Sequence, residues 1–235
     1  MTIQVYEVGG AVRDTFRKVK NNDIDYAIEA PSYEDMKNYV IASGAVIFVE
    51  HPEFVTIRAK WTPPEYSKPI ACDFTLCRKE SEYLDNRHPS NIEPGTIYED
   101  LARRDFTMNA IARNIQTGEI IDPYRGKDDI QAQVIRSVGD PNHRFQEDAL
   151  RIMRALRFQT VLGFDVTNAI YDAVVNNIKL LDNISAERIR DELHKMFQHS
   201  SVGAMKTLMY FSREELSHIF NERTGIWLEP TMKAR

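Results

Sequence analysis

The stretch Val8-Gly9-Gly10-Ala11-Val12-Arg13-Asp14, followed shortly by Asp23-Ile24-Asp25-Tyr26-Ala27-Ile28, decides the fold of the N-terminal part of this chain. The apolar residues before the two glycines predict a strand, and the residues after them predict the start of a helix. The second segment alternates and is rich in β-branched residues, so we expect a strand with Asp23 and Asp25 on one face. Neighbouring carboxylates repel each other unless a cation lies between them, and a pair with only oxygen ligands favours Mg²⁺ over zinc.

The glycine turn predicts a phosphate site. Gly9 and Gly10 let backbone amides approach a phosphate closely, the start of the helix adds partial positive charge, and Arg13 is expected to pair with the phosphate directly. The structural alternatives are a simple tight turn for the two glycines and a solvated strand edge for the two aspartates. Two-metal phosphoryl and nucleotidyl transfer usually needs a third carboxylate. Asp73, in the predicted strand Ile70–Cys77, is the candidate, with a structural strand-end residue as the alternative.

Composition and charge limit the class of protein. The chain has 235 residues, 43% of them hydrophobic, which is enough for one large domain or two small ones. The net charge of −5 argues against a protein whose whole surface coats nucleic acid, although clustered arginines permit a local basic channel. Without a leader-like start or a bilayer-length apolar run, we expect a cytoplasmic protein. Cys72 and Cys77 would lie on opposite strand faces and form no disulfide.

The pattern of elements predicts an α+β fold with two domains, 1–140 and 141–235. In the first domain, alternating runs predict strands and one helix, whereas Pro63-Pro64, Tyr83–Gly95 and 122–126 are expected to be loops or turns. From Arg144 the period becomes helical, and one long helix is expected to stop at Gly163. The expected strands are Gln4–Val8, Ile24–Ile28, Ala45–Val49, Phe54–Ala59, Ile70–Cys77 and Ala110–Asn114; the other expected helices are Tyr33–Ser43, Asn168–Leu180, Ala186–Gln198 capped by Ser185, and Val202–Tyr210.

Four motifs in order resemble those of the class II CCA-adding tRNA nucleotidyltransferases and their bacterial poly(A) polymerase relatives, over roughly residues 5 to 200. They are Gly9–Asp14 with Asp23–Asp25 (first motif), Arg103-Arg104-Asp105-Phe106-Thr107-Met108-Asn109-Ala110 (second motif), Asp122-Pro123-Tyr124-Arg125-Gly126 (third motif), and Glu147-Asp148-Ala149-Leu150-Arg151 through Phe158 (fourth motif). The resemblance implies a polymerase-β-like nucleotidyltransferase head followed by a helical neck and body. It also implies Mg²⁺, the substrates CTP and ATP, and the 3′ end of tRNA as partner, with neither a membrane nor DNA.

The fourth motif has a chemistry of its own. On one helix Asp148, Arg151 and Arg154 would share a side, and such a run is usually a solvated face. Cytosine and adenine, however, each present an exocyclic amine beside a ring-nitrogen acceptor, which an aspartate and an arginine match. Uracil and guanine would leave both side chains unpaired, so the aspartate and arginine would reject these two bases as well as bind cytosine and adenine.

The resemblance assigns further site residues. It places this base-selecting pair at Asp148 and Arg151, braced by Glu147. It implies that Arg104, Arg154 and Arg157 contact the nucleotide or hold the template. Asp105 and Asn109 match positions that select ribose, and a helix cap and a buried amide are the structural alternatives.

Some features depart from the family. Arg125 stands where glycine is more frequent in the family, and the segment between Asp25 and Asp73 is somewhat longer than usual. Full-length members extend well beyond 235 residues, and this difference in length leaves the tRNA specificity open. A loop at Arg78–Pro94 favours complete CCA addition over CC addition. Four alternatives remain: a poly(A) polymerase, a partial (CC- or A-adding) enzyme on another RNA, a catalytically silent RNA-binding protein, and an unrelated magnesium phosphohydrolase.

Overall fold

The computed structural model describes residues 3–20, 24–83 and 89–220, and for residues 80–83 and 89–91 only the backbone is described. Asp23 of the first motif therefore lies outside the described residues. The chain divides into two compact units, one made of Met1–Glu82 and Pro89–Ala132 (the sheet unit) and one made of Tyr83–His88 and Gln133–Arg235 (the helical unit). The predicted domain limits of 1–140 and 141–235 stay a prediction.

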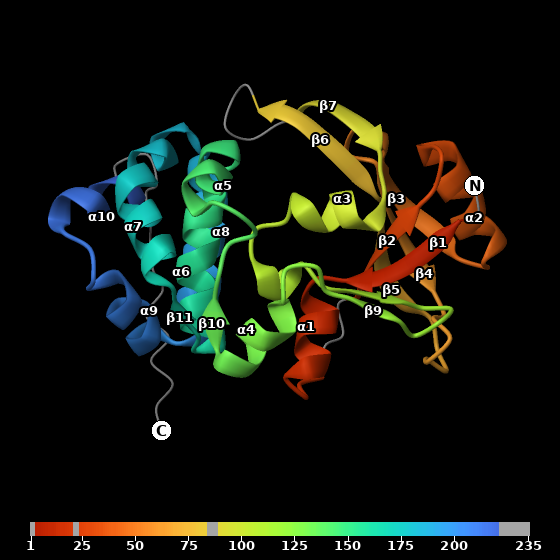
Figure 1. Ribbon diagram of the computed structural model, residues 1–235, viewed down its shortest axis with the longest axis horizontal. Coiled ribbons are helices and arrows are strands. Elements are labelled where there is room, and N and C mark those ends of the chain that lie inside the picture. Colours follow the sequence, from red (N-terminus) through yellow and green to blue (C-terminus); the bar gives the residue numbers. More distant parts are fainter. Residues whose placement is uncertain (1–2, 21–23, 84–88, 221–235) are drawn as a thin grey trace. The chain divides into compact units, whose positions relative to one another are not determined.

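The sheet unit is built on a mixed sheet (Figure 1), which confirms the predicted α+β class. In the described part of the chain its strand order is β3-β4-β5-β2-β1-β8-β9, and only β2 and β5 are parallel neighbours. The strands are β1 (Gln4–Val8), β2 (Ile24–Glu29), β3 (Val46–His51), β4 (Thr56–Trp61), β5 (Ile70–Leu76), β8 (Ala112–Asn114) and β9 (Ile120–Ile121). Its helices are α1 (Gly10–Phe16), α2 (Tyr33–Ala42), α3 (Ile97–Ala102) and α4 (Gly126–Ala132), with the 3₁₀ turns η1 (Pro52–Phe54) and η2 (Thr107–Asn109).

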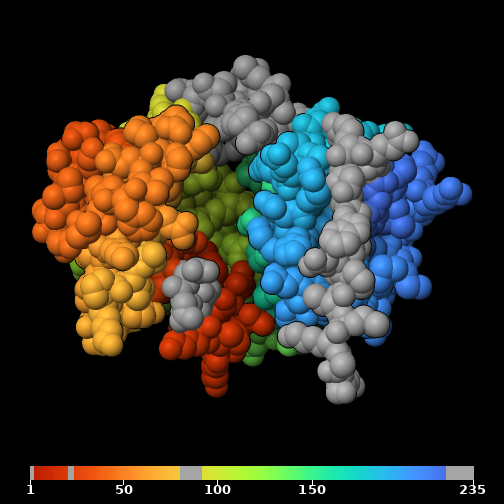
Figure 2. Space-filling model, turned by 180° about the vertical axis from the view of Figure 1, so that it is seen from behind, coloured from red at the N-terminus to blue at the C-terminus, as the bar shows by residue number. Residues whose placement is uncertain are grey.

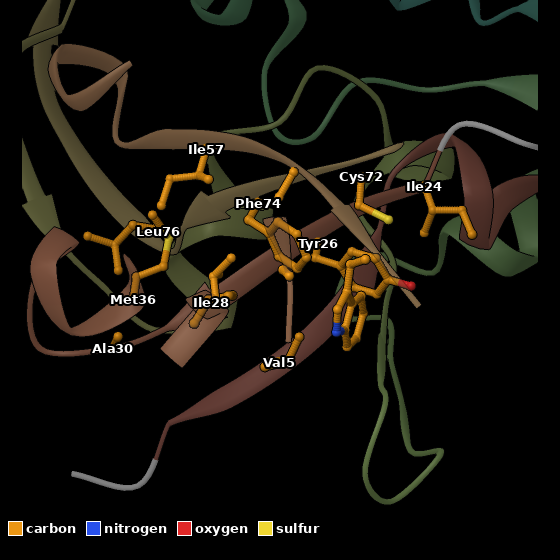
Figure 3. Packing of buried hydrophobic residues seen from close by; sticks show 14 of the residues in the cluster. Val5, Ile24, Tyr26, Ile28, Ala30, Met36, Ile57, Cys72, Phe74 and Leu76 are labelled. Atoms are coloured by element: carbon orange, nitrogen blue, oxygen red, sulfur yellow. The ribbon is translucent and has the colours of Figure 1, made fainter. Parts of the chain in front are cut away.

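One face of this sheet carries the apolar core. Tyr26 stacks on Phe74 of the neighbouring strand with ring centroids 5.3 Å apart, and Trp61 meets both rings edge-on. Met36 from α2 is fully buried in the same cluster (Figure 3). Alternation along β2 and β5 sends these side chains to the core, so the residues between them, among them Asp25 and Asp73, face the other way. The core thus fixes which face carries the carboxylates.

The edge strand β3 is more exposed than the other long strands of this sheet. Along it only Ile47 is partly buried, and Val46, Phe48 and Val49 are exposed. This segment, orange in Figure 2, lies on the surface of the sheet unit. The alternating pattern that predicted a strand here therefore does not mark a buried face.

The predicted loop at 83–95 is wrong for the part that the structure describes. Strand β6 (Arg78–Tyr83) pairs with β7 (Pro89–Pro94) in a separate ribbon. Prolines stand at both ends of β7, where a missing N–H group costs little pairing. At the base of the ribbon the Gly95 N–H donates to the Cys77 carbonyl at 2.8 Å. A Cβ on Gly95 would lie 2.8 Å from the Lys79 backbone nitrogen, so the ribbon requires glycine there.

The helical unit contains a break that the sequence analysis missed. The expected single helix is two, α5 (Pro141–Glu147) and α6 (Leu150–Leu162), with Asp148 extended between them at φ −142° and ψ 103°. The predicted end is confirmed, because Gly163 caps α6 in the left-handed region at φ 69°. The remaining elements are the short parallel pair β10 (Val134–Ile135) and β11 (Asp165–Val166), helices α7 (Asn168–Asn177), α8 (Ala186–His199), α9 (Ser201–Leu208) and α10 (Arg213–Ile219), and the 3₁₀ segment η3 (Ile178–Asn183).

None of the helices in the described part of the chain has both the length and the apolar character needed to cross a bilayer.

Candidate functional site

Two of the three predicted catalytic carboxylates are neighbours in the sheet. Asp25 of β2 and Asp73 of β5 are direct partners in the parallel register, so their side chains share the face opposite the core. Asp25 is exposed, and the half-exposed Asp73 carboxylate has the Nε atom of Arg58 at 3.3 Å. Asp73 was predicted from its position in the chain alone, and the register places it beside Asp25. The described part of the chain has no cluster of three metal-binding side chains, and Asp23 lies outside that part.

The glycine turn lies against these carboxylates. Val8 is the register partner of Asp25, and Gly9 then turns the chain with φ 69° and ψ −133°, a conformation that favours glycine. A Cβ added to Gly9 would lie 3.4 Å from Arg104 Nη1 and 3.6 Å from Asp25 Oδ2. The first and second motifs therefore meet at Gly9, where an added Cβ would be in van der Waals contact with both Arg104 and Asp25.

Arg13 holds the two motifs together. Its guanidinium is almost fully buried; Nε and Nη2 each donate to the neighbouring Asp14 carboxylate at 3.0 Å, and Nη1 donates to Asn109 Oδ1 at 2.9 Å. Asn109 in turn donates to Asp105 Oδ1 at 3.1 Å, and this oxygen also accepts the Phe106 N–H. Arg13, Asp105 and Asn109 thus form one buried network; whether they also touch phosphate or ribose stays a prediction.

Arg104 is fixed by a different acid. Asp100 of α3 accepts hydrogen bonds from Arg103 and from Arg104, whose Nη2 atom lies 2.9 Å away. Burial of Asp100 opposes its ionisation, but the charges of both arginines outweigh burial and hold the pKa of the carboxyl below its usual range. Arg104 Nη1 also donates to the Asn109 carbonyl at 3.3 Å. Asp100 is not among the residues predicted from the sequence, although its spacings of three and four residues from the arginines are those of helical ion pairs.

The third motif supports the second one. The Asp122 carboxylate accepts the N–H groups of Gly126 and Lys127 at 2.7 and 2.9 Å and so caps α4. Gly126 packs directly on the backbone of η2, since a Cβ there would lie 2.0 Å from the Thr107 carbonyl oxygen. The buried Thr107 hydroxyl donates to Asp129 of α4 at 2.7 Å. The role of this motif is therefore structural, and it determines where η2 places Asn109.

In the helical unit, Asp148 lies between two helices, whereas the sequence predicted that it lies within one long helix. Its Oδ1 atom accepts the Leu150 N–H at 3.1 Å and its backbone carbonyl accepts the Arg151 N–H, so it lies between the end of α5 and the N-cap residue Ala149 of α6 instead of within a helix. An aspartate side chain that bonds the backbone in this way competes with helix continuation, which explains the break. Asp148, Arg151 and Arg154 consequently do not form one continuous helical row.

Glu147 and Arg151 form the expected contact. Arg151 Nη1 donates to Glu147 Oε2 at 2.6 Å and to the Arg144 carbonyl at 3.0 Å. Glu147 also pairs with Arg144 Nη1 at 3.1 Å. Because Arg151 is almost fully buried, these bonds restrict its guanidinium to one arrangement. The role of the pair toward a nucleotide stays a prediction.

The other two arginines of the fourth motif stack on one ring. The guanidinium carbons of Arg154 and Arg157 lie 5.4 and 4.1 Å from the ring centroid of Phe158. Arg157 also pairs through Nε with the buried Glu192 of α8. Glu192 was not found by the sequence analysis, because its partner lies on another helix.

The chain belongs to the poly A polymerase head domain family, whose model matches residues 5–136. Residues 163–211 match a second family model, described as the probable RNA and SrmB-binding site of polymerase A. These matches confirm the family that the four motifs resemble.

Similar proteins and structures carry CCA-adding names. The chain is 36% identical over 226 residues to the CCA-adding enzyme of Bacillus subtilis (95% of this chain, 54% of the relative) and 40% identical over 200 residues to that of Anoxybacillus flavithermus (82% and 46%). It resembles the crystal structure of the Bacillus stearothermophilus CCA-adding enzyme in complex with CTP (TM-score 0.73, 34% identity, 88% of this chain, 47% of that chain). It also resembles the Thermotoga maritima CCA-adding enzyme complexed with tRNA_CCA (TM-score 0.73, 25% identity, 97% and 50%). The chain spans about half the length of these relatives.

Proposed function

We propose that the chain is a metal-dependent, template-independent nucleotidyltransferase that adds CMP and AMP, from CTP and ATP, to the 3′ end of tRNA. The observation that carries this proposal is the in-register pair Asp25 and Asp73, with the Gly9 turn and Arg104 next to it. Related proteins named CCA-adding enzymes, among them one in complex with CTP and one with tRNA, support the choice of substrates. The division into a catalytic part at 1–140 and a base-selecting, RNA-binding part at 141–235 belongs to the same proposal, as does a cytoplasmic location.

Asp23 and Asp25 would hold Mg²⁺, and Asp73 would complete the carboxylate set. The donors present fit this ion, because Asp25 and Asp73 supply only oxygen atoms and their side chains share one face of the sheet. When bound, the ion lowers the pKa of the attacking 3′ hydroxyl and neutralises charge on the phosphates. Arg58, 3.3 Å from Asp73, keeps that carboxylate oriented before the ion binds.

The residues around the turn would orient the nucleotide. Gly9 and Gly10 present backbone to the phosphates, and Arg104, already fixed by Asp100, supplies a positive charge beside Gly9. Asp105 and Asn109 would contact the ribose while Arg13 holds both in place through Asn109.

The base would be selected in the helical unit. The Asp148 carboxylate accepts the exocyclic amine of cytosine or adenine, and Arg151, braced by Glu147, donates to the adjacent ring nitrogen. Arg154 and Arg157 hold this arrangement through Phe158 and Glu192.

A second candidate is addition of AMP alone to another RNA, as a poly(A) polymerase. The observation that favours it is the match of residues 5–136 to the poly A polymerase head domain. Both candidates use the same carboxylates, so they differ in the nucleotides and the RNA they accept.

Incorporation of radiolabelled CTP and ATP onto tRNA lacking its CCA end tests the proposal. We expect labelling from both nucleotides with the unaltered chain, and none with Asp25→Asn at unchanged thermal midpoint. Incorporation of ATP alone would favour the polymerase candidate. Incorporation of neither nucleotide, by a folded chain with Mg²⁺ present, would leave an RNA-binding protein without catalysis.

A further inference from the structure

Arg188 of α8 lies where a cation is electrostatically unfavourable. Ser185 is the cap residue of this helix, and the Arg188 N–H donates to the Ser185 carbonyl at 3.1 Å, so the side chain belongs to the first turn. The N-terminal end of a helix carries partial positive charge and favours acids instead. A cation at this position therefore needs a compensating contact outside its own helix.

That contact is the carboxylate of Asp148. Arg188 Nη2 lies 3.4 Å from Asp148 Oδ2, and the side chains of Arg188 and Asp148 are 28% and 22% exposed. The other oxygen, Oδ1, accepts the Leu150 N–H at 3.1 Å. The carboxylate is thus held by two elements, the start of α6 through one oxygen and α8 through the other. This arrangement determines the direction in which its remaining acceptor positions point.

The guanidinium of Arg188 has donor capacity left. Its Nη1 atom is buried and has no hydrogen-bond partner in the part of the chain that the structure describes. Buried donors without partners are rare and costly. Nη2 of the guanidinium contacts Asp148, and Nη1 remains able to donate a hydrogen bond when the carboxylate shifts to accept an amine.

We propose that Arg188 is a positioning residue for nucleotide selection, which keeps the Asp148 carboxylate turned so that it accepts only an exocyclic amine. This inference rests on the proposed function. An ionised carboxylate is purely an acceptor and cannot pair with the carbonyl that uracil or guanine presents at the same place. Loss of the Arg188 contact frees the carboxylate to rotate away from the direction in which it accepts the amine.

Three variants test the proposal with full-length protein, Mg²⁺ and tRNA lacking its CCA end. They are Arg188→Gln, Arg188→Lys, and Arg190→Gln as matched control. Arg190 is exposed on the same helix, and its Nε bonds only the Ala186 carbonyl within that helix among the described contacts. The measured quantities are kcat/KM for CTP against UTP and for ATP against GTP.

We expect Arg188→Gln to lower both ratios about tenfold, Arg188→Lys to lower them about threefold because it keeps the charge, and Arg190→Gln to leave them unchanged. Unchanged ratios in both Arg188 variants would overturn the inference, and so would an equal loss of rate for all four nucleotides. If circular dichroism shows that Arg188→Gln does not fold, the ratios of Arg188→Lys decide alone. Failure of the unaltered chain to add any nucleotide would instead reject the proposed function.

Discussion

Replacement of Gly126 by alanine tests the inferred support of the second motif by the third. A Cβ at this position would lie 2.0 Å from the Thr107 carbonyl oxygen, 2.6 Å from its carbon and 3.0 Å from Ile111 Cγ1. Both Thr107 atoms belong to the backbone, which cannot move aside as the end of a flexible side chain would. Contact at normal separation therefore requires a shift of more than about 1 Å between α4 and η2.

The magnitude follows from two opposing effects. Gly126 lacks a positive φ, and alanine within a helix is favoured over glycine by up to about 1 kcal/mol. Overpacking against a fixed neighbour costs about 1–3 kcal/mol, and more when the backbone must move. We expect a net destabilisation of about 2 kcal/mol, which corresponds to a fall in Tm of about 4–8 °C for a chain of this size.

Thermal unfolding followed by circular dichroism, with incorporation assays well below Tm, measures both consequences. Gly139→Ala is the matched control, because an added Cβ there has no atom within 4 Å and only the φ of 75° disfavours alanine. We expect Gly126→Ala to lose activity even when fully folded, since η2 places Asn109, and Gly139→Ala to keep it. A Gly126→Ala protein as stable and as active as the unaltered chain would refute the inferred contact.

Three further predictions concern Glu192, Cys72 and Asp148. Glu192→Ala removes the acid that pairs with the Arg157 guanidinium and should destabilise the protein by about 3 kcal/mol. As a control, Glu187→Ala in the exposed first turn of α8 should change the stability little. Equal denaturant midpoints for the two variants would contradict this prediction. Burial raises the pKa of Cys72 to about 12, so this thiol should react with a thiol reagent at pH 8 only after unfolding, and reaction at the rate of a free thiol in the native protein would be the contrary result. Asp148→Asn keeps an acceptor but adds a donor, so it should raise UMP incorporation relative to CMP about tenfold, and an unchanged ratio would remove Asp148 from base selection.

Periodicity was sufficient where local pattern and packing agree. The strands β1, β2 and β5 and the helix α2 occur close to their predicted limits, because a strand or helix period with one buried face specifies each of them. The juxtaposition of Asp25 with Asp73 follows once β2 and β5 are known to be parallel neighbours, although sequence alone gives no register between distant strands. The family resemblance supplied the remaining site residues.

The elements that were missed depend on contacts between distant residues. The ribbon of β6 and β7 forms because these two segments pair with each other, whereas their prolines favour a loop when the local sequence is considered alone. The break at Asp148 comes from a side chain that bonds the Leu150 N–H, although the apolar pattern continues through it. Arg188 is 40 positions from Asp148, and no local pattern connects them.

The most direct test of the account is a crystal structure of this chain with CTP and Mg²⁺. We predict that the cytosine amine lies within hydrogen-bond distance of the Asp148 carboxylate and that the ring nitrogen accepts from Arg151, with the triphosphate beside Gly9 and the ion on Asp25. A cytosine bound with its Watson–Crick edge away from Asp148 and Arg151 would contradict the proposal that these two residues select the base.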